Sequence, residues 1–197
     1  MMLQAILLIG IGAGVSGGLS ALTSITAAMW GGTTAKYTLS NDDVAKTGSG
    51  GGFANIRIIN SAPVLDGDFV WQYTQAGDGG NNTDSSYGFY DISEDSTWSA
   101  TDYRQNLHLM TNSFWFDMVT GLSPSRFQTY EGGTGKTSNL PFSVGDTIKW
   151  QRTGTSLKLF TGGVERYEWT GVSESLRFCM SGFTVNAANI SDVQFQN

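Results

Sequence analysis

The chain has little of the chemistry that many catalytic and metal sites use. Its 197 residues contain one cysteine, Cys179, and one histidine, His108. A single cysteine excludes an internal disulfide framework and any cysteine-rich metal site. A single histidine leaves little for a histidine-ligated metal or a Ser-His catalytic pair. We expect His108 to be a strand residue that makes an ordinary hydrogen bond.

Charged residues are also scarce, and they are unevenly placed. Asp, Glu, Lys and Arg make up 14% of the sequence, and the formal net charge is −6. No cluster of Lys and Arg occurs, which excludes nucleic acid as a partner because phosphate binding needs a basic face. Residues 1–35 contain no charged side chain at all. The sequence therefore predicts two parts: an apolar N-terminal arm, 1–35, and an acidic, aromatic-rich body, 36–197.

The arm contains Gly12-Ala13-Gly14-Val15-Ser16-Gly17, a G-x-G-x-x-G spacing. A dinucleotide-binding fingerprint needs in addition a helix, a second strand and an acidic residue about 20 residues further on. Beyond Ala28 no alternation of helix and strand patterns follows. We therefore predict no cofactor.

Three of the glycines, Gly10, Gly14 and Gly18, are spaced by four and would form a small-residue contact stripe on a helix. Each glycine costs a helix in water about 1 kcal/mol relative to alanine, so this segment needs apolar surroundings. We expect residues 1–30 to contact copies of this chain and other proteins of a large assembly. A membrane anchor and a cleaved secretory signal are the alternatives.

The body shows the period-2 alternation of β-strands. In 69–74, FVWQYT, and in 114–119, FWFDMV, every second residue is aromatic or apolar, and 146–169 contains three such strands joined by turns. Roughly ten to twelve strands fit between 36 and 196, which predicts an all-β protein with a two-sheet antiparallel sandwich. We expect Trp71, Phe116 and Trp150 to point into its core.

Three stretches carry a resemblance to a known family. FSVGDTIKWQRTGTSLKLFTGGVERYEW (142–169), YTLSNDDVAKTGS (37–49) and NISDVQFQN (189–197) resemble segments of concanavalin A-like and SPRY-like domains. The resemblance covers about residues 36–197. It implies a jelly-roll-like sandwich of two curved sheets in which the last strand returns beside the first.

Some concanavalin A-like proteins are glucanases, whose Glu-x-Asp-x-x-Glu pattern places the acids on one face of a strand. The acidic run here is Asp91-Ile92-Ser93-Glu94-Asp95, in which Asp91 and Glu94 would point to opposite faces of a strand, so we predict a turn. We expect no catalytic residues and no enzyme, with a glycan hydrolase as a minor alternative. The run YEGGTGKTS (130–138) lacks the first glycine of a nucleotide-binding loop and is predicted to be a surface hairpin or loop.

Two segments, 76–90 and 93–106, combine short polar residues with aromatic ones, as sugar-binding loops do. The candidate ligand-binding residues are Asp78, Asn81, Asn82, Asp84, Tyr87, Trp98 and Tyr103. The acidic and amide residues lack the spacing of a calcium-binding EF-hand loop, so no metal is predicted.

Together these observations favour a non-enzymatic attachment protein. By analogy with phage and virus surface proteins of this fold, we expect display at a virion surface and binding of a glycan or host surface. A membrane-anchored or secreted lectin-like adhesin of a cell is the alternative.

Overall fold

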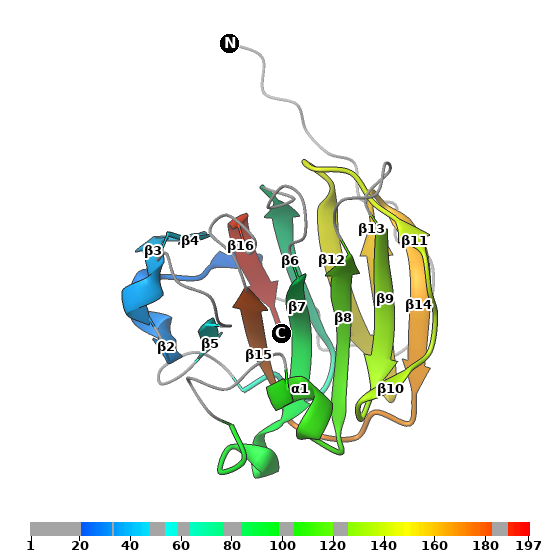
Figure 1. The fold of residues 1–197 in the computed structure, drawn as a ribbon. Helices are drawn as coiled ribbons and strands as arrows, with labels where there is room; N and C mark the ends of the chain where they lie inside the picture. The colour runs from blue at the N-terminus through cyan, green and yellow to red at the C-terminus, as the bar shows by residue number, and fades with distance from the viewer. Residues whose placement is uncertain are drawn as a thin grey trace.

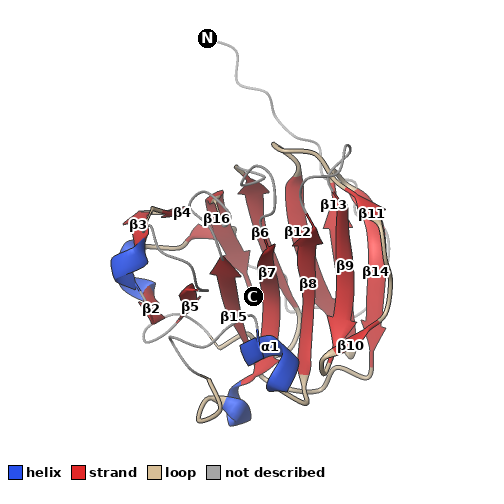
Figure 2. Cartoon of the chain, viewed as in Figure 1, coloured by secondary structure: helices blue, strands red, loops and turns tan. Residues whose placement is uncertain are grey.

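Strands with alternating apolar side chains form two antiparallel sheets, one in front of the other (Figures 1 and 2). The computed structural model describes residues 21–32, 34–47, 54–58, 64–76, 84–98, 105–119, 126–182 and 189–197. Each sheet has eight strands.

Sheet A, the rear layer in Figure 1, has the order β14-β13-β12-β6-β16-β4-β3, and β1 also pairs with β16. Its strands are β1 (Thr23–Ser24), β3 (Tyr37–Ser40), β4 (Asp43–Lys46), β6 (Phe69–Gln75), β12 (Thr147–Thr153), β13 (Ser156–Thr161), β14 (Val164–Thr170) and β16 (Ile190–Gln196).

Sheet B, the front layer, has the order β10-β9-β8-β7-β15-β5-β2, and β11 also pairs with β9. Its strands are β2 (Trp30–Gly32), β5 (Ala54–Ile58), β7 (Asp84–Asp91), β8 (Ser113–Val119), β9 (Arg126–Glu131), β10 (Thr134–Gly135), β11 (Leu140–Pro141) and β15 (Leu176–Gly182). The helical segments are short: α1 (Gln105–Leu109), η1 (Ala27–Met29), η2 (Thr34–Lys36) and η3 (Ile92–Glu94).

The predicted all-β antiparallel sandwich is confirmed. The three strands expected within 146–169 are β12, β13 and β14, which pair consecutively. The last strand, β16, returns beside the early strands β1 and β4. The 130–138 segment begins with the β9–β10 hairpin, as expected from its glycines.

Aromatic side chains fill the space between the two sheets. Trp71, Phe116 and Trp150 are 1%, 2% and 0% exposed, which confirms their predicted interior position. Trp71 of sheet A stacks on Phe178 of sheet B at 4.6 Å between ring centroids, and Trp150 lies 5.2 Å from Phe89. These contacts join the layers directly.

The sandwich begins earlier than the predicted boundary between residues 35 and 36. β1 pairs with β16 and β2 pairs with β5, so two strands within residues 23–32 belong to the sheets. Ile25 and Trp30 are buried in the core, which explains why this uncharged stretch joins the body. The assembly residues Gly10, Gly14 and Gly18 lie outside the described residues.

Within the described ranges, no helix is both long enough and apolar enough to span a membrane.

Replacing Trp150 by alanine should lower the free energy of unfolding by about 3–5 kcal/mol, because a cavity would open among the aromatic rings of both sheets. Denaturant unfolding followed by circular dichroism measures this. Val164→Ala is the control, since Val164 is 52% exposed and its truncation should change stability by about 0.5 kcal/mol or less. Wild-type stability of the Trp150→Ala protein would contradict the interior position.

Candidate functional site

The outer face of sheet B carries a row of polar side chains that crosses five neighbouring strands. The pairing register places these residues side by side on strands β9, β8, β7, β15 and β5: Gln128, Asp117, Ser86, Ser181 and Asn55. We call this set the polar row. Adjacent strands lie about 4.8 Å apart, so the row is about 19 Å long.

Four of the five members of the polar row are buried although they face away from the core, and only Gln128 is partly exposed. Ser86 donates a hydrogen bond to Asp117 Oδ1 at 3.2 Å. The buried hydroxyl of Ser181 has no hydrogen-bond partner among the described residues.

An aromatic cluster lies beside the polar row on the same face. Trp115 and Tyr130 stack in parallel, with ring centroids 4.1 Å apart and planes 7° apart, and His108 packs edge-on against Trp115 at 4.6 Å. Gly88 is required opposite Trp115, because a Cβ there would lie 2.3 Å from Trp115 Cβ. His108 is in α1 rather than in a strand, so that expectation is wrong: the residues around it form a short helical turn packed on the sheet.

Helix α1, which precedes β8, lies across the lower ends of β7 and β8 and covers one end of this face (Figure 1). Asp91 accepts a hydrogen bond from the backbone N–H of Ser93, which confirms that the acidic run forms a turn. The Glu94 carboxylate accepts hydrogen bonds from the backbone N–H groups of Thr111 and Asn112, at 3.0 and 2.8 Å. These hydrogen bonds hold the residues that follow β7 against the residues that precede β8.

A charged cluster borders the polar row at β5 and β15. Arg57 and Arg177 each contact one oxygen of the Asp95 carboxylate, at 2.8 and 3.1 Å. The Tyr90 hydroxyl donates to Asp95 at 2.7 Å and accepts from Arg57 at 2.7 Å. Burial raises the pKa of Tyr90 well above its ordinary value, so the hydroxyl keeps its proton and remains a donor.

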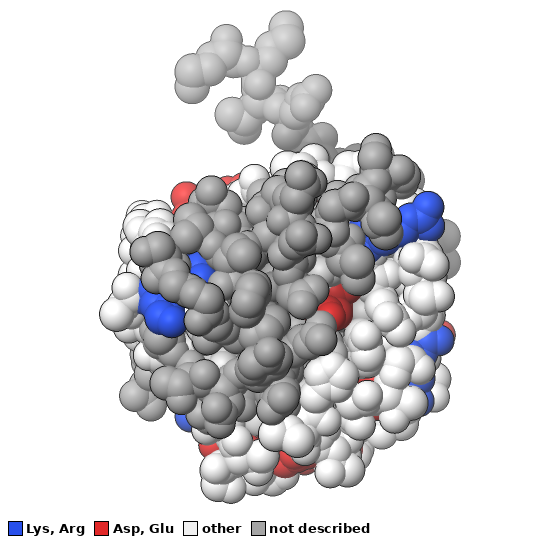
Figure 3. All heavy atoms as spheres, viewed as in Figure 1, with Lys and Arg blue, Asp and Glu red and all other residues white. Residues whose placement is uncertain are grey.

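In the space-filling view from the same side, basic atoms lie at the left and right margins and acidic atoms are visible near the middle (Figure 3). Charge on the described part of this face is therefore mixed in sign rather than gathered in one patch.

The predicted ligand residue Trp98 borders this cluster. Its ring covers the Arg57 guanidinium at 4.2 Å, and it packs against Gly32, where a Cβ would lie 2.6 Å from the indole. Trp98 is half-buried, and its indole nitrogen has no described hydrogen-bond partner. The side chain is thus held in place by its neighbours and still partly exposed.

Tyr87 has a different position from the one its loop suggested. It is buried in the core, accepts a hydrogen bond from Gln75 and stacks on Tyr73, and burial raises its pKa to about 12. Its ring has no surface for an external sugar, so we withdraw Tyr87 as a stacking residue. Asp84 begins β7. The candidates outside the described residues are Asp78, Asn81, Asn82 and Tyr103.

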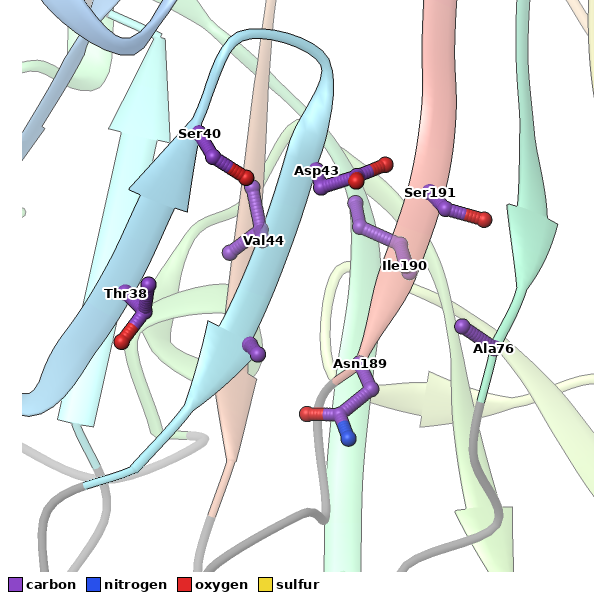
Figure 4. Close-up of a pocket in the computed structure, with 9 residues that line it drawn as sticks. Thr38, Ser40, Asp43, Val44, Ala76, Asn189, Ile190 and Ser191 are labelled. Atoms are coloured by element: carbon purple, nitrogen blue, oxygen red, sulfur yellow. The ribbon is translucent and has the colours of Figure 1, made fainter.

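A separate pocket of about 270 Å³ opens between the β3–β4 hairpin and the ends of β16 and β6 (Figure 4). β4 pairs with β16 only at Val44 and Ile190, and the side chain of Asn189 accepts a hydrogen bond from the Lys46 backbone at 3.2 Å. The pocket exists because these two strands separate. Its lining combines hydroxyl groups and the Asp43 carboxylate with the apolar side chains of Val44 and Ile190.

No protein-family model matches the sequence, and no curated protein matches it. Solved structures do share its architecture. A human SPRY domain aligns with a TM-score of 0.51 and 12% identity, covering 82% of this chain and 93% of that domain. A native glycosidic hydrolase aligns with a TM-score of 0.53 and 11% identity, covering 94% of this chain and 98% of that protein. An endo-β-1,3-glucanase from Pyrococcus furiosus aligns with a TM-score of 0.52 and 11% identity, covering 83% of this chain and 78% of that protein. The chain therefore has the concanavalin A-like, SPRY-like sandwich fold.

The same comparisons correct the expectation that the chain is not an enzyme. That expectation depended on the missing Glu-x-Asp-x-x-Glu pattern, yet two of the structures with this fold are glycosidases. The fold accommodates glycan hydrolysis, and the expectation of a non-enzymatic protein is withdrawn.

Cys179 lies on the outer face of sheet B, opposite Gly88 in the register, and is buried. Burial raises the pKa of its thiol well above the ordinary value, although nearby Arg57 acts in the opposite direction. At pH 8 the folded protein should therefore react with a thiol reagent at least about a hundredfold more slowly than the protein unfolded in denaturant. Equal rates in a spectrophotometric assay would contradict the burial of Cys179.

Proposed function

We propose that the chain binds carbohydrate on the outer face of sheet B. The observation that carries the proposal is the accessible surface at the two ends of the polar row: the partly exposed Gln128 amide at one end, and the partly exposed Trp98 over Arg57 at the other. An amide both donates and accepts hydrogen bonds, and a guanidinium donates them. Sugar hydroxyls need both kinds of partner, placed at fixed positions next to aromatic surface.

A sugar reaches this face at its margins. Gln128 is partly exposed at one end of the row; at the other end Asn55 is buried, and the partly exposed side chain there is Trp98, which lies over Arg57. The C–H face of a pyranose ring packs on an aromatic ring, while its hydroxyls turn toward polar groups. The glycosidic hydrolase and the glucanase that share this fold support a sugar as the ligand.

We further propose, from the sequence of residues 1–30, that this arm attaches the chain to a larger assembly and that the sandwich is displayed outward, as at a virion surface. A cell-surface or secreted adhesin is the alternative location. The position of β1 supports the arrangement: β1 pairs with β16 in sheet A, whereas the polar row lies on the outer face of sheet B. Attachment through the residues before β1 would leave the polar row free for a ligand.

Trp98→Ala should lower glycan affinity about tenfold or more, because it removes the exposed aromatic surface at one end of the row. Single-site affinity is expected to be near millimolar, about −4 kcal/mol, so a glycan array should be probed with multimerised protein. Gln194→Ala, on the outer face of sheet A, is the control and should bind as the wild type does.

Release of reducing ends from every bound glycan should be measured in the same experiment, which separates binding alone from hydrolysis. Unchanged binding by Trp98→Ala would move the site away from this end of the row. A multimer that binds no glycan would contradict the proposed function.

Gly14→Glu should prevent assembly through the arm, because it places a charge within an uncharged small-residue stripe. The sandwich should still fold, since its described strands begin at Thr23. Light scattering of the purified protein measures the assembly, and circular dichroism confirms the fold. Unchanged assembly would contradict a contact role for Gly10, Gly14 and Gly18.

A further inference from the structure

The charged cluster beside the polar row has the composition of a carboxylate receptor. Arg57 and Arg177 come from neighbouring strands and point their guanidinium groups at the two oxygens of one carboxylate, that of Asp95. Paired arginine contacts of this kind recognise a carboxylate by geometry as well as by charge. Two positive groups face one negative group, so the cluster keeps an excess positive charge in a chain whose net charge is −6.

The position of the carboxylate within the cluster makes it replaceable. The Asp95 side chain is 36% exposed, against 18% and 20% for Arg57 and Arg177. Asp95 follows the single turn η3, whereas the arginines are anchored in strands, where Arg177 also donates to the carbonyl of Ile58. The receptor is therefore fixed in the sheet, and its occupant is carried by a surface turn.

The cluster also lies where a bound sugar would reach it. Asn55, the last member of the polar row, is two residues before Arg57 on the same face of β5, about 7 Å away along the strand. Trp98 covers the Arg57 guanidinium and is the partly exposed aromatic side chain at this end of the row. A sugar ring on the exposed part of Trp98 would place an acidic substituent toward the arginines.

We propose that the glycan recognised at this face carries carboxylate groups, as uronic and sialic acids do, and that Asp95 occupies the carboxylate position in the free protein. This inference rests on the proposed function, because it names the class of sugar bound at the same site. Binding then exchanges one carboxylate for another between Arg57 and Arg177. The Asp95 carboxylate moves into solvent, which its exposure already permits.

The test compares each acidic polysaccharide with its own neutral derivative: polygalacturonate with its methyl ester, hyaluronan with carboxyl-reduced hyaluronan, and alginate with its propylene glycol ester. At low salt, at least one acidic chain should bind about tenfold more tightly than its neutral derivative, and the difference should shrink at 0.5 M salt. Affinity electrophoresis or calorimetry with the multimerised full-length protein measures both members of a pair.

Three variants test which residues cause the preference for the acidic chain over its neutral derivative. Arg177→Gln should abolish the acidic preference, and Arg166→Gln, which removes the same charge from an edge strand of sheet A, should keep it. Asp95→Asn should raise the affinity for the acidic chain severalfold and leave the neutral derivative unchanged, because it removes the internal competitor. A gain in affinity cannot result from loss of structure, so this variant separates competition from a purely structural ion pair.

The inference is overturned if acidic and neutral chains bind equally, or if Asp95→Asn, folded by circular dichroism, shows no gain. Equal binding would leave the proposed function standing, since the glycan would still bind at this face. Failure of every chain of both kinds to bind would overturn the proposed function together with the inference.

Discussion

The structure depends on direct aromatic contact between its two sheets. Trp71 of β6 stacks on Phe178 of β15, and Trp150 of β12 packs on both Phe89 and Phe116. Each of these rings is large and nearly fully buried, so together they supply much of the apolar area that folding removes from water. A sandwich with few charges and no disulfide needs an interior of this kind.

The interior also determines what the outer face of sheet B carries. Successive side chains of a strand point to opposite faces, so a strand that buries Phe114 and Phe116 inward must present Trp115 and Asp117 outward. The same rule gives the outward positions of β7 and β15. The polar row is thus the complement of the aromatic core, fixed in register by the hydrogen bonds that pair β9, β8, β7, β15 and β5.

Local pattern was enough to predict the sandwich, the consecutive strands within 146–169 and the interior rings, because period-2 alternation and turn residues act over a few positions. The sequence alone predicted that Asp117 points to the opposite face of its strand from Phe116. The alignment of Asp117 with Ser86 and Ser181 was not, because it depends on the pairing register of strands far apart in the chain. Tyr87 was misplaced for a related reason: its neighbours are polar, yet it points inward and packs against Tyr73 of the other sheet.

The buried polar groups of the outer face also favour a role beyond folding. Burying the Asp117 carboxylate and the Ser181 hydroxyl, which has no partner among the described residues, costs free energy, and apolar side chains at these positions would avoid that cost. The aromatic interior is large enough to offset it. This face buries polar side chains on four adjacent strands, β8, β7, β15 and β5. It lies next to an arginine pair whose carboxylate partner is carried by a surface turn, and such a margin has the features expected of a surface that exchanges an internal contact for that of a ligand.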